Sequence, residues 1–189
     1  MTRIIAGQAR GRRLATPPGQ GTRPTADRAR EGLFSALESL LGGLSGLRVI
    51  DAYAGSGAVG LEALSRGAAA ALLIESDRRA AAVVRENLAA LGLSGGRLAA
   101  DRVERLAAEK CQDPPYDLLF LDPPYAHAAD ALAETVAAFA AQGWLAGDAV
   151  VCVERAARDP EWVWPEGFAP LRARAYGEGM LWYGHRREQ

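Results

Sequence analysis

From residue 47 onward, short apolar runs alternate with helical patterns, and this alternation is the feature that most constrains the fold. We expect strands at residues 47–51, 70–75, 97–100, 117–122 and 149–154, separated by helices that begin near Ala58, Asp77, Arg102 and Ala128. In the second of these helices, Val84, Leu88 and Leu91 recur on one face. Such alternation builds a parallel sheet covered by helices on both sides, so the sequence predicts an α/β, Rossmann-like fold.

The C-terminal end departs from this alternation. Two short strand patterns, at 171–176 and 180–185, are joined by Gly177-Glu178-Gly179. A glycine-containing connection of this length between two strands is typical of a β-hairpin. We therefore predict a mostly parallel sheet that ends in an antiparallel hairpin.

The N-terminal end is predicted to be a separate small element. Residues 3–6 and 12–15 could pair as a hairpin around a turn at 7–11, followed by a loop rich in proline and glycine. Thr25 then offers an N-cap for an amphipathic helix. This divides the chain into an arm, residues 1–24, and a main domain, residues 25–189.

Charge is distributed unevenly between these two parts. The first 30 residues carry seven arginines and one acid, Asp27, for a net charge of +6; the remaining 159 residues carry 15 basic and 22 acidic groups, for −7. A basic arm on an acidic body favours contact with a polyanion, although a solvated tail is the simpler alternative. The candidate nucleic-acid contacts are Arg3, Arg10, Arg12, Arg13, Arg23 and Arg28.

Composition limits the remaining possibilities. A chain of 189 residues suffices for one domain with a full core. Cys111 and Cys152 fit no disulfide or metal spacing, so we expect reduced thiols and no metal site. The N-terminus lacks the apolar segment of a signal peptide, and no apolar run is long enough to span a bilayer. We expect a cytoplasmic protein with no membrane partner, and a monomer.

A glycine-rich loop follows the first predicted strand, which ends at Asp51. Gly55, Gly57 and Gly60 match the spacing G-x-G-x-x-G, which alone is a weak signal for a nucleotide cofactor. A nicotinamide dinucleotide would place its pyrophosphate here, with Glu75 on a ribose. S-adenosylmethionine fits the loop equally well, so the glycines alone leave both cofactors open.

The carboxylate of Asp51 favours S-adenosylmethionine. It would repel a pyrophosphate, but it would attract the ammonium and sulfonium groups of S-adenosylmethionine. Glu75 could then accept from both ribose hydroxyls, and Asp101 from the adenine amine, although Asp101 could equally be a helix N-cap. The predicted cofactor-binding residues are Asp51, Tyr53, Ala54, Gly55, Ser56, Gly57, Gly60, Glu75, Asp101 and Arg102.

The most informative stretch is Asp122-Pro123-Pro124-Tyr125, at the end of the fourth predicted strand. An exocyclic amine on a nucleic-acid base is a poor nucleophile, because its lone pair is delocalised into the ring. Asp122 and the Pro123 carbonyl could each accept one N–H and turn the lone pair toward a methyl donor. Pro124 would stiffen the turn, and Tyr125 would stack on the base. A simple strand-ending turn is the alternative.

With these motifs, the chain resembles the RsmD-type bacterial methyltransferases, which act on guanine N2 of 16S ribosomal RNA. The resemblance extends over nearly the whole chain, through residues 3–7, 11–14, 23–34, 51–67 and 122–125. Where this chain has Tyr53, the family more often has phenylalanine. The resemblance implies a class I methyltransferase domain, an N-terminal element that holds RNA, and an assembled small ribosomal subunit or its precursor as substrate.

Four other functions remain to be weighed. An adenine-N6 methyltransferase of DNA or RNA would share the motif that begins at Asp122, so the choice of guanine depends on the resemblance. A protein-glutamine methyltransferase would have asparagine at that position. A nicotinamide dehydrogenase would need a Tyr-x-x-x-Lys pattern, and the single lysine, Lys110, is not part of one. A non-catalytic ribosomal-RNA assembly factor would not need the intact motif.

Overall fold

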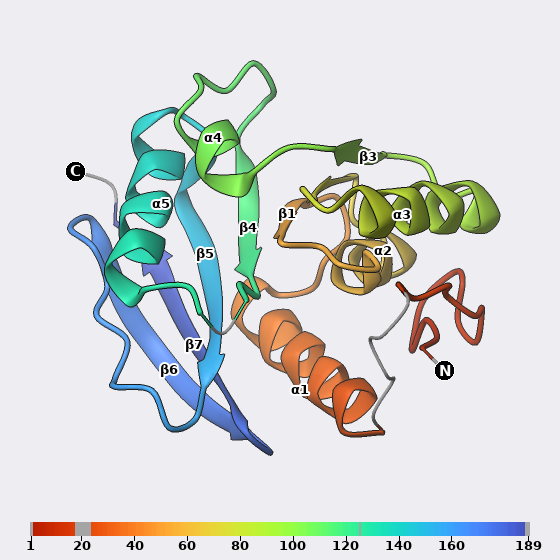
Figure 1. The fold of residues 1–189 in the computed structure, drawn as a ribbon, viewed down its shortest axis with the longest axis horizontal. Helices are drawn as coiled ribbons and strands as arrows, with labels where there is room; N and C mark the ends of the chain where they lie inside the picture. Colours follow the sequence, from red (N-terminus) through yellow and green to blue (C-terminus); the bar gives the residue numbers. More distant parts are fainter. Residues whose placement is uncertain (1, 18–23, 125, 188–189) are drawn as a thin grey trace.

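The computed structural model describes residues 2–17, 24–124 and 126–187. Its centre is a seven-stranded sheet in the order β3-β2-β1-β4-β5-β7-β6 (Figure 1). The strands are β1 (Arg48–Ala52), β2 (Ala70–Ile74), β3 (Gly96–Ala99), β4 (Tyr116–Leu121), β5 (Leu145–Ala156), β6 (Phe168–Tyr176) and β7 (Gly179–Arg186). The first five run parallel, and β7 pairs antiparallel with both β5 and β6.

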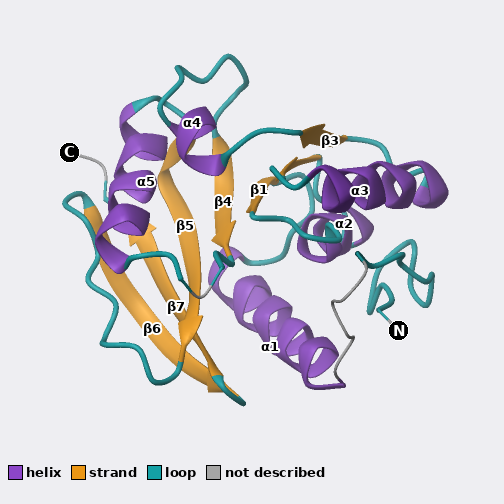
Figure 2. Ribbon diagram, in the orientation of Figure 1, coloured by secondary structure: helices purple, strands orange, loops and turns teal. Residues whose placement is uncertain are grey.

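Helices cover both faces of this sheet (Figure 2). They are α1 (Pro24–Leu41), α2 (Ala58–Ser65), α3 (Arg78–Leu91), α4 (Val103–Ala107) and α5 (Ala129–Ala141). Successive strand residues point to opposite faces, so the central strands bury apolar side chains on both faces of the sheet. Ile50 packs with α4 and α5, whereas its neighbour Val49 packs with α1. The predicted α/β architecture is therefore confirmed.

Several element boundaries differ from the sequence prediction, among them the start of β6 at Phe168 instead of residue 171. The helix α1 begins at Pro24, so Thr25 lies within its first turn and is not the N-cap; proline is favoured at a first helical position because it lacks the N–H that would be unpaired there. The strand β5 begins at Leu145 instead of residue 149. Gly147 and Asp148 interrupt the apolar pattern, so the sequence does not indicate this earlier start. The register between β4 and β5 also shifts between Tyr116 and Leu118.

The N-terminal segment has hairpin-like pairing but forms no strand of its own. A single antiparallel bridge joins Arg3 and Arg13, so the predicted pair of strands is reduced to one bridge. Around this bridge the N–H of Ile4 donates to the Arg12 carbonyl and that of Leu14 to the Thr2 carbonyl, each at 2.9 Å, while neighbouring residues bond to the helices. Ile4 and Leu14 are buried in a cluster with residues of α2 and α3, and the N–H groups of Ile5 and Ala6 donate to the Glu62 carboxylate.

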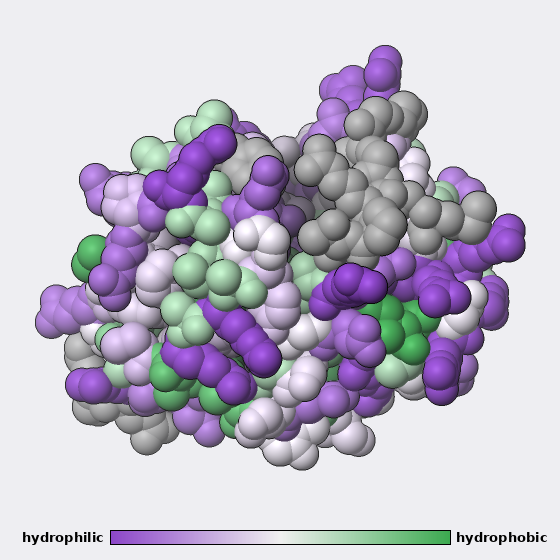
Figure 3. Space-filling model, turned by 90° about the horizontal axis from the view of Figure 1, so that it is seen from below, coloured by the Kyte–Doolittle hydropathy of each residue, from purple (hydrophilic) through white to green (hydrophobic). Residues whose placement is uncertain are grey.

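Few large apolar side chains are exposed on the described part of the chain. The face in Figure 3 mixes hydrophilic and hydrophobic residues, with only small hydrophobic patches. Val163 and Leu171 are the large apolar side chains most exposed among the described residues. None of the described helices combines the length and the apolar character that crossing a membrane requires.

Candidate active site

The loop after β1 is held by its own backbone and by Asp51. One Asp51 carboxylate oxygen accepts the N–H of Gly60 at 2.8 Å, and so joins the end of β1 to α2. Gly57 adopts a left-handed conformation (φ 79°) directly before α2. A side chain at Gly57 would also approach a Leu73 methyl carbon to 2.7 Å. The left-handed turn therefore requires a glycine here, and a larger residue would also press on Leu73 of β2.

Glu75 closes the same loop from β2. Its carboxylate accepts the N–H of Gly55 at 2.8 Å and that of Asp77 at 2.7 Å. The parallel register places Ala52 beside Ile74, so Glu75 lies next to the start of the loop. This is the position at which an acid can reach a ribose bound over the loop.

Asp101 follows β3, at the same edge of the sheet. The residue at the N-cap position of α4 is Arg102, so Asp101 does not cap that helix. Its carboxylate instead accepts the N–H of Arg102 at 2.8 Å and lies 3.4 Å from the Arg105 guanidinium. The Asp101 side chain therefore lies at this edge of the sheet, where we predict from the sequence that it accepts from the adenine amine.

Tyr53 has an unusual backbone and two partners that the sequence analysis missed. Its φ of 62° makes it the one described non-glycine residue with positive φ, a conformation that costs about 1–2 kcal/mol. Its hydroxyl donates to Glu104 at 2.7 Å, and the His127 ring packs edge-on against its ring. These contacts connect the loop after β1 to α4 and to the segment after Pro124.

Asp122 and Pro123 leave β4 directly beside that loop. In the register of β1 and β4, Ala52 lies opposite Leu121. The N–H of Asp122 also donates to the Ala52 carbonyl at 3.4 Å. The Pro124 carbonyl accepts the N–H of His127 at 2.9 Å and forms a turn. Tyr125 lies outside the described residues.

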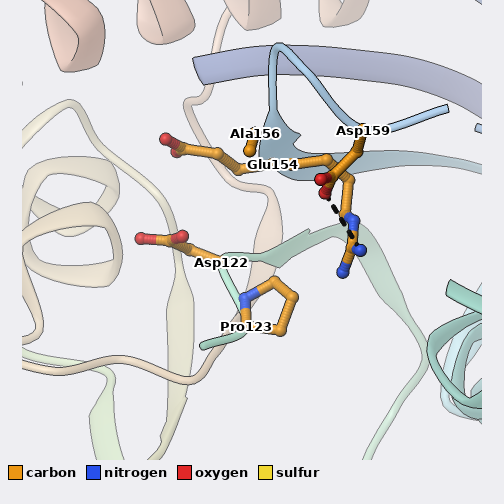
Figure 4. Close-up of a pocket in the computed structure, with 6 residues that line it drawn as sticks. Asp122, Pro123, Glu154, Ala156 and Asp159 are labelled. Carbon is orange, nitrogen blue, oxygen red and sulfur yellow. Dashed lines mark ion pairs between the residues drawn. The ribbon is translucent and has the colours of Figure 1, made fainter. Parts of the chain in front are cut away.

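Glu154, near the C-terminal end of β5, is a second acidic residue of this region that sequence analysis missed. Leu121 lies opposite Val153, so Asp122 and Glu154 follow one another on adjacent parallel strands. Figure 4 shows that their carboxyl groups extend to the same side. In the sequence Glu154 is only the first acid after the apolar run of β5, and no motif marks it as a site residue.

The environment of Asp122 and Glu154 disfavours two negative charges. The Asp122 side chain is reached by solvent but is surrounded by protein, and this burial raises its pKa. Burial also raises the pKa of Glu154, and the negative charge of Asp122 raises it further. The nearby Arg155 does not neutralise them, because its guanidinium pairs with Asp159 at 3.0 Å and donates to the His127 carbonyl.

The charge of the whole site fits a cationic ligand. Burial raises the pKa of Asp51 to about 8, with further contributions from the negative charges of Asp122 and Glu75. Carboxylates from β1, β2 and β4 thus meet at one edge of the sheet. A ligand with an ammonium and a sulfonium centre would relieve their repulsion, whereas a pyrophosphate would add to it. The residues therefore fit S-adenosylmethionine better than a dinucleotide.

The arginines predicted to contact RNA are exposed on the docked N-terminal segment. Arg3, Arg10, Arg12 and Arg13 face solvent, as does Arg28 on α1; Arg23 lies outside the described residues. The segment is fixed next to the loop after β1 by Asn87 of α3. The Asn87 side chain exchanges two hydrogen bonds with the backbone of Ala15 and donates a third to the Ser56 carbonyl.

Among the described residues, no group of three or more histidine, cysteine or acidic side chains could hold a metal ion. Cys152 is buried and Cys111 is partly buried, and both are free thiols.

The sheet order, the antiparallel β7 between β5 and β6, and the ligand edge after β1 and β4 together define a class I methyltransferase fold. Residues 2–185 match the family described as Conserved hypothetical protein 95. The chain belongs to this family, which is that of the RsmD-type methyltransferases.

Several members of this family are similar to the chain in sequence or in structure. The "Ribosomal RNA small subunit methyltransferase D" of Escherichia coli (strain K12) is 42% identical over 152 residues, which are 80% of this chain and 73% of that protein. The protein of the same name from Haemophilus influenzae is 32% identical over 93% of this chain and 89% of its own length. The solved structure of yhhF from Escherichia coli superposes with a TM-score of 0.84 at 36% identity, covering 100% and 99% of the two chains.

Proposed function

We propose that this chain transfers a methyl group from S-adenosylmethionine to the exocyclic N2 of a guanine in 16S ribosomal RNA. The observation that carries the proposal is the β1–β4 register, which places the cofactor loop and Asp122 at the ends of adjacent strands. The names of its Escherichia coli and Haemophilus influenzae relatives support small-subunit ribosomal RNA as the substrate.

The cofactor would lie over the loop that follows β1. Asp51 and the loop residues Tyr53 to Gly57 would surround its amino-acid end, Glu75 its ribose, and Asp101 with Arg102 its adenine. When bound there, S-adenosylmethionine supplies an electrophilic methyl group. The protein's contribution is then to place the nucleophile in line with that group and to stabilise the charge that develops.

At the target base, Asp122 would accept one N–H of the amine and the Pro123 carbonyl the other. Two acceptors outside the base plane favour a pyramidal nitrogen, whose lone pair then points toward the methyl group. Pro124 would keep the turn rigid, and Tyr125 would offer a ring for stacking with the flipped base. The amine proton would leave late, to Asp122 or to water.

The exposed arginines of the N-terminal segment would hold the RNA backbone. Arg3, Arg10, Arg12 and Arg13 lie on a segment that Asn87 fixes beside the cofactor loop. Contacts with phosphate there would position the RNA without reading its sequence. An assembled small subunit, or its precursor, is the substrate that we infer.

The test is methyl transfer with purified protein, tritiated S-adenosylmethionine and small ribosomal subunits from an Escherichia coli strain that lacks methyltransferase D. Nucleoside mass spectrometry would identify the product. We expect label in N2-methylguanosine. Label in N6-methyladenosine would favour the adenine alternative, and S-adenosylmethionine binding without transfer would favour a non-catalytic assembly factor.

A further inference from the structure

Asp122 and Glu154 form a pair of carboxylates that the rest of the described structure does not use. They follow β4 and β5 where these strands lie side by side, and they line one pocket together with Pro123. Within residues 2–17, 24–124 and 126–187, neither carboxylate accepts a hydrogen bond or pairs with a cation. The neighbouring groups that could have served them are engaged elsewhere: Arg155 pairs with Asp159, and the Ala156–Asp159 turn bonds internally.

Two adjacent acceptors select a ligand edge with two adjacent donors. Guanine presents such an edge, because its N2 amine and its N1–H are neighbours on the Watson–Crick side. Adenine and cytosine each present an amine next to a bare ring nitrogen, which is an acceptor. A carboxylate facing that nitrogen would leave two acceptors opposed, which is costly even in a partly desolvated site.

We propose that Glu154 is a specificity-determining residue that accepts the N1–H of the target guanine while Asp122 accepts from its N2 amine. This inference rests on the proposed function and identifies the base that the site reads. Asp122 acts on the reacting nitrogen, and Glu154 acts on the neighbouring atom of the same edge. Gly179 of β7 supports this role for Glu154. A Cβ atom at that position would lie 3.1 Å from a Glu154 carboxylate oxygen. The glycine therefore leaves room for the carboxylate.

The pair also explains why a donor-rich base would bind well. Two neighbouring carboxylates in a partly desolvated site cannot both be ionised at low cost. Donors from N1 and N2 would satisfy both and favour the ionised forms. With adenine, Glu154 would instead have to be protonated and donate to N1, so raising the pH would abolish that binding.

The test compares guanine with 2-aminopurine, which keeps the amine at C2 but has a bare N1. The target nucleotide would first be located by mass spectrometry of RNA methylated by the wild-type protein. Small subunits would then be reconstituted with RNA that carries guanine or 2-aminopurine at that position. At about pH 8.5, where most of Glu154 would be ionised and most of the target guanine would still carry its N1 proton, we expect the wild type to prefer guanine by about tenfold or more in kcat/KM.

The variant Glu154→Gln should remove that preference. Its carboxamide can accept from the N1–H of guanine through oxygen, or donate to the bare N1 of 2-aminopurine through nitrogen. We therefore expect the guanine to 2-aminopurine ratio to fall to within about threefold of unity. A ratio measured within one protein preparation does not depend on how much of the variant is folded.

The matched control is Asp148→Asn, which removes one carboxylate from the opposite, exposed end of β5 and should keep the wild-type ratio. An unchanged ratio in Glu154→Gln, with guanine still methylated, would overturn the role of Glu154 alone. Methylation of adenine by the wild type would instead overturn the proposed function, so the two failures are distinguishable.

Discussion

The carboxylate of Glu62 accepts a hydrogen bond from the backbone N–H of Ile5, 2.7 Å away and 57 residues distant in the chain. Glu62 is fully buried in α2, and it also accepts from Ala6 and pairs with Arg66 at 2.8 Å. An acidic helix residue thus fixes the basic N-terminal segment to the catalytic domain. These contacts hold the segment in place within the fold.

Replacing Glu62 should therefore destabilise the whole domain. We expect Glu62→Ala to lower the free energy of unfolding by about 3 kcal/mol, because two backbone N–H groups and Arg66 lose their partner in a buried site. Urea unfolding measures this change. The control is Glu38→Ala, which removes the other, half-exposed partner of Arg66 and should cost less than about 1 kcal/mol. Equal losses would show that the contacts with the N-terminal segment contribute little.

Asp51 predicts how stability depends on pH. Its pKa is raised to about 8 in the folded protein, whereas an aspartate in an unfolded chain ionises near pH 4. Between these values the folded state holds a proton that the unfolded state has released. The free energy of unfolding should therefore fall as the pH rises from about 4 to about 8, by at most about 1.4 kcal/mol per pH unit for this group.

The variant Asp51→Asn should remove this contribution, since asparagine has no proton to release and can still accept the N–H of Gly60. Urea unfolding of both proteins without cofactor, at several pH values in this window, makes the comparison. Parallel pH profiles for the variant and the wild type would contradict the assignment.

The sequence predicted most of the sheet, because its strands are apolar and are separated by helices with a clear period. It also predicted Asp122, because the motif that begins there is local. It could not predict Glu154, whose place beside Asp122 depends on the pairing of β4 with β5. Glu62 and Asn87 resemble surface residues of helices, and only contacts across 56 to 72 residues of chain reveal that they hold the N-terminal segment.

Substitution of Asp122 should separate catalysis from cofactor binding. We expect Asp122→Ala to bind S-adenosylmethionine within about threefold of the wild-type affinity, since the loop contacts of Asp51 and Glu75 remain. Methyl transfer should fall by about 100-fold or more, because the variant has no side-chain acceptor for the reacting amine. Calorimetry and tritium transfer measure the two effects. A parallel loss of cofactor affinity would place Asp122 in the cofactor site instead.

Tyr125 carries a prediction that comes from the sequence. If its ring stacks on the flipped base, Tyr125→Ala should reduce kcat/KM by about 10- to 100-fold, as the loss of about 1–3 kcal/mol of stacking implies. Tyr125→Phe keeps the ring and should stay within about threefold of the wild type. Steady-state transfer to small subunits distinguishes them, and equal damage from both would assign the role to the hydroxyl.

The exposed arginines allow a cleaner test of RNA binding than deletion of the N-terminal segment. Deletion would expose the cluster that buries Ile4 and Leu14, so it would confuse binding with stability. Single changes such as Arg10→Gln or Arg13→Gln remove only an exposed charge. Each should weaken RNA binding without changing cofactor affinity. Each should also lower the slope of log affinity against log salt by about 1 for every phosphate that the arginine had neutralised.

The matched control for these variants is Arg187→Gln, an exposed arginine directly after β7; Figure 1 shows β7 and the N-terminal segment on opposite sides of the molecule. It makes the same change in net charge, so it should leave the salt slope unchanged if binding depends on where the charge lies. Filter binding of small-subunit RNA across a salt series measures the slopes. If all three variants shifted the slope equally, the attraction would come from overall charge, and the N-terminal segment would not be the RNA-binding element that its buried anchors at Glu62 and Asn87 suggest.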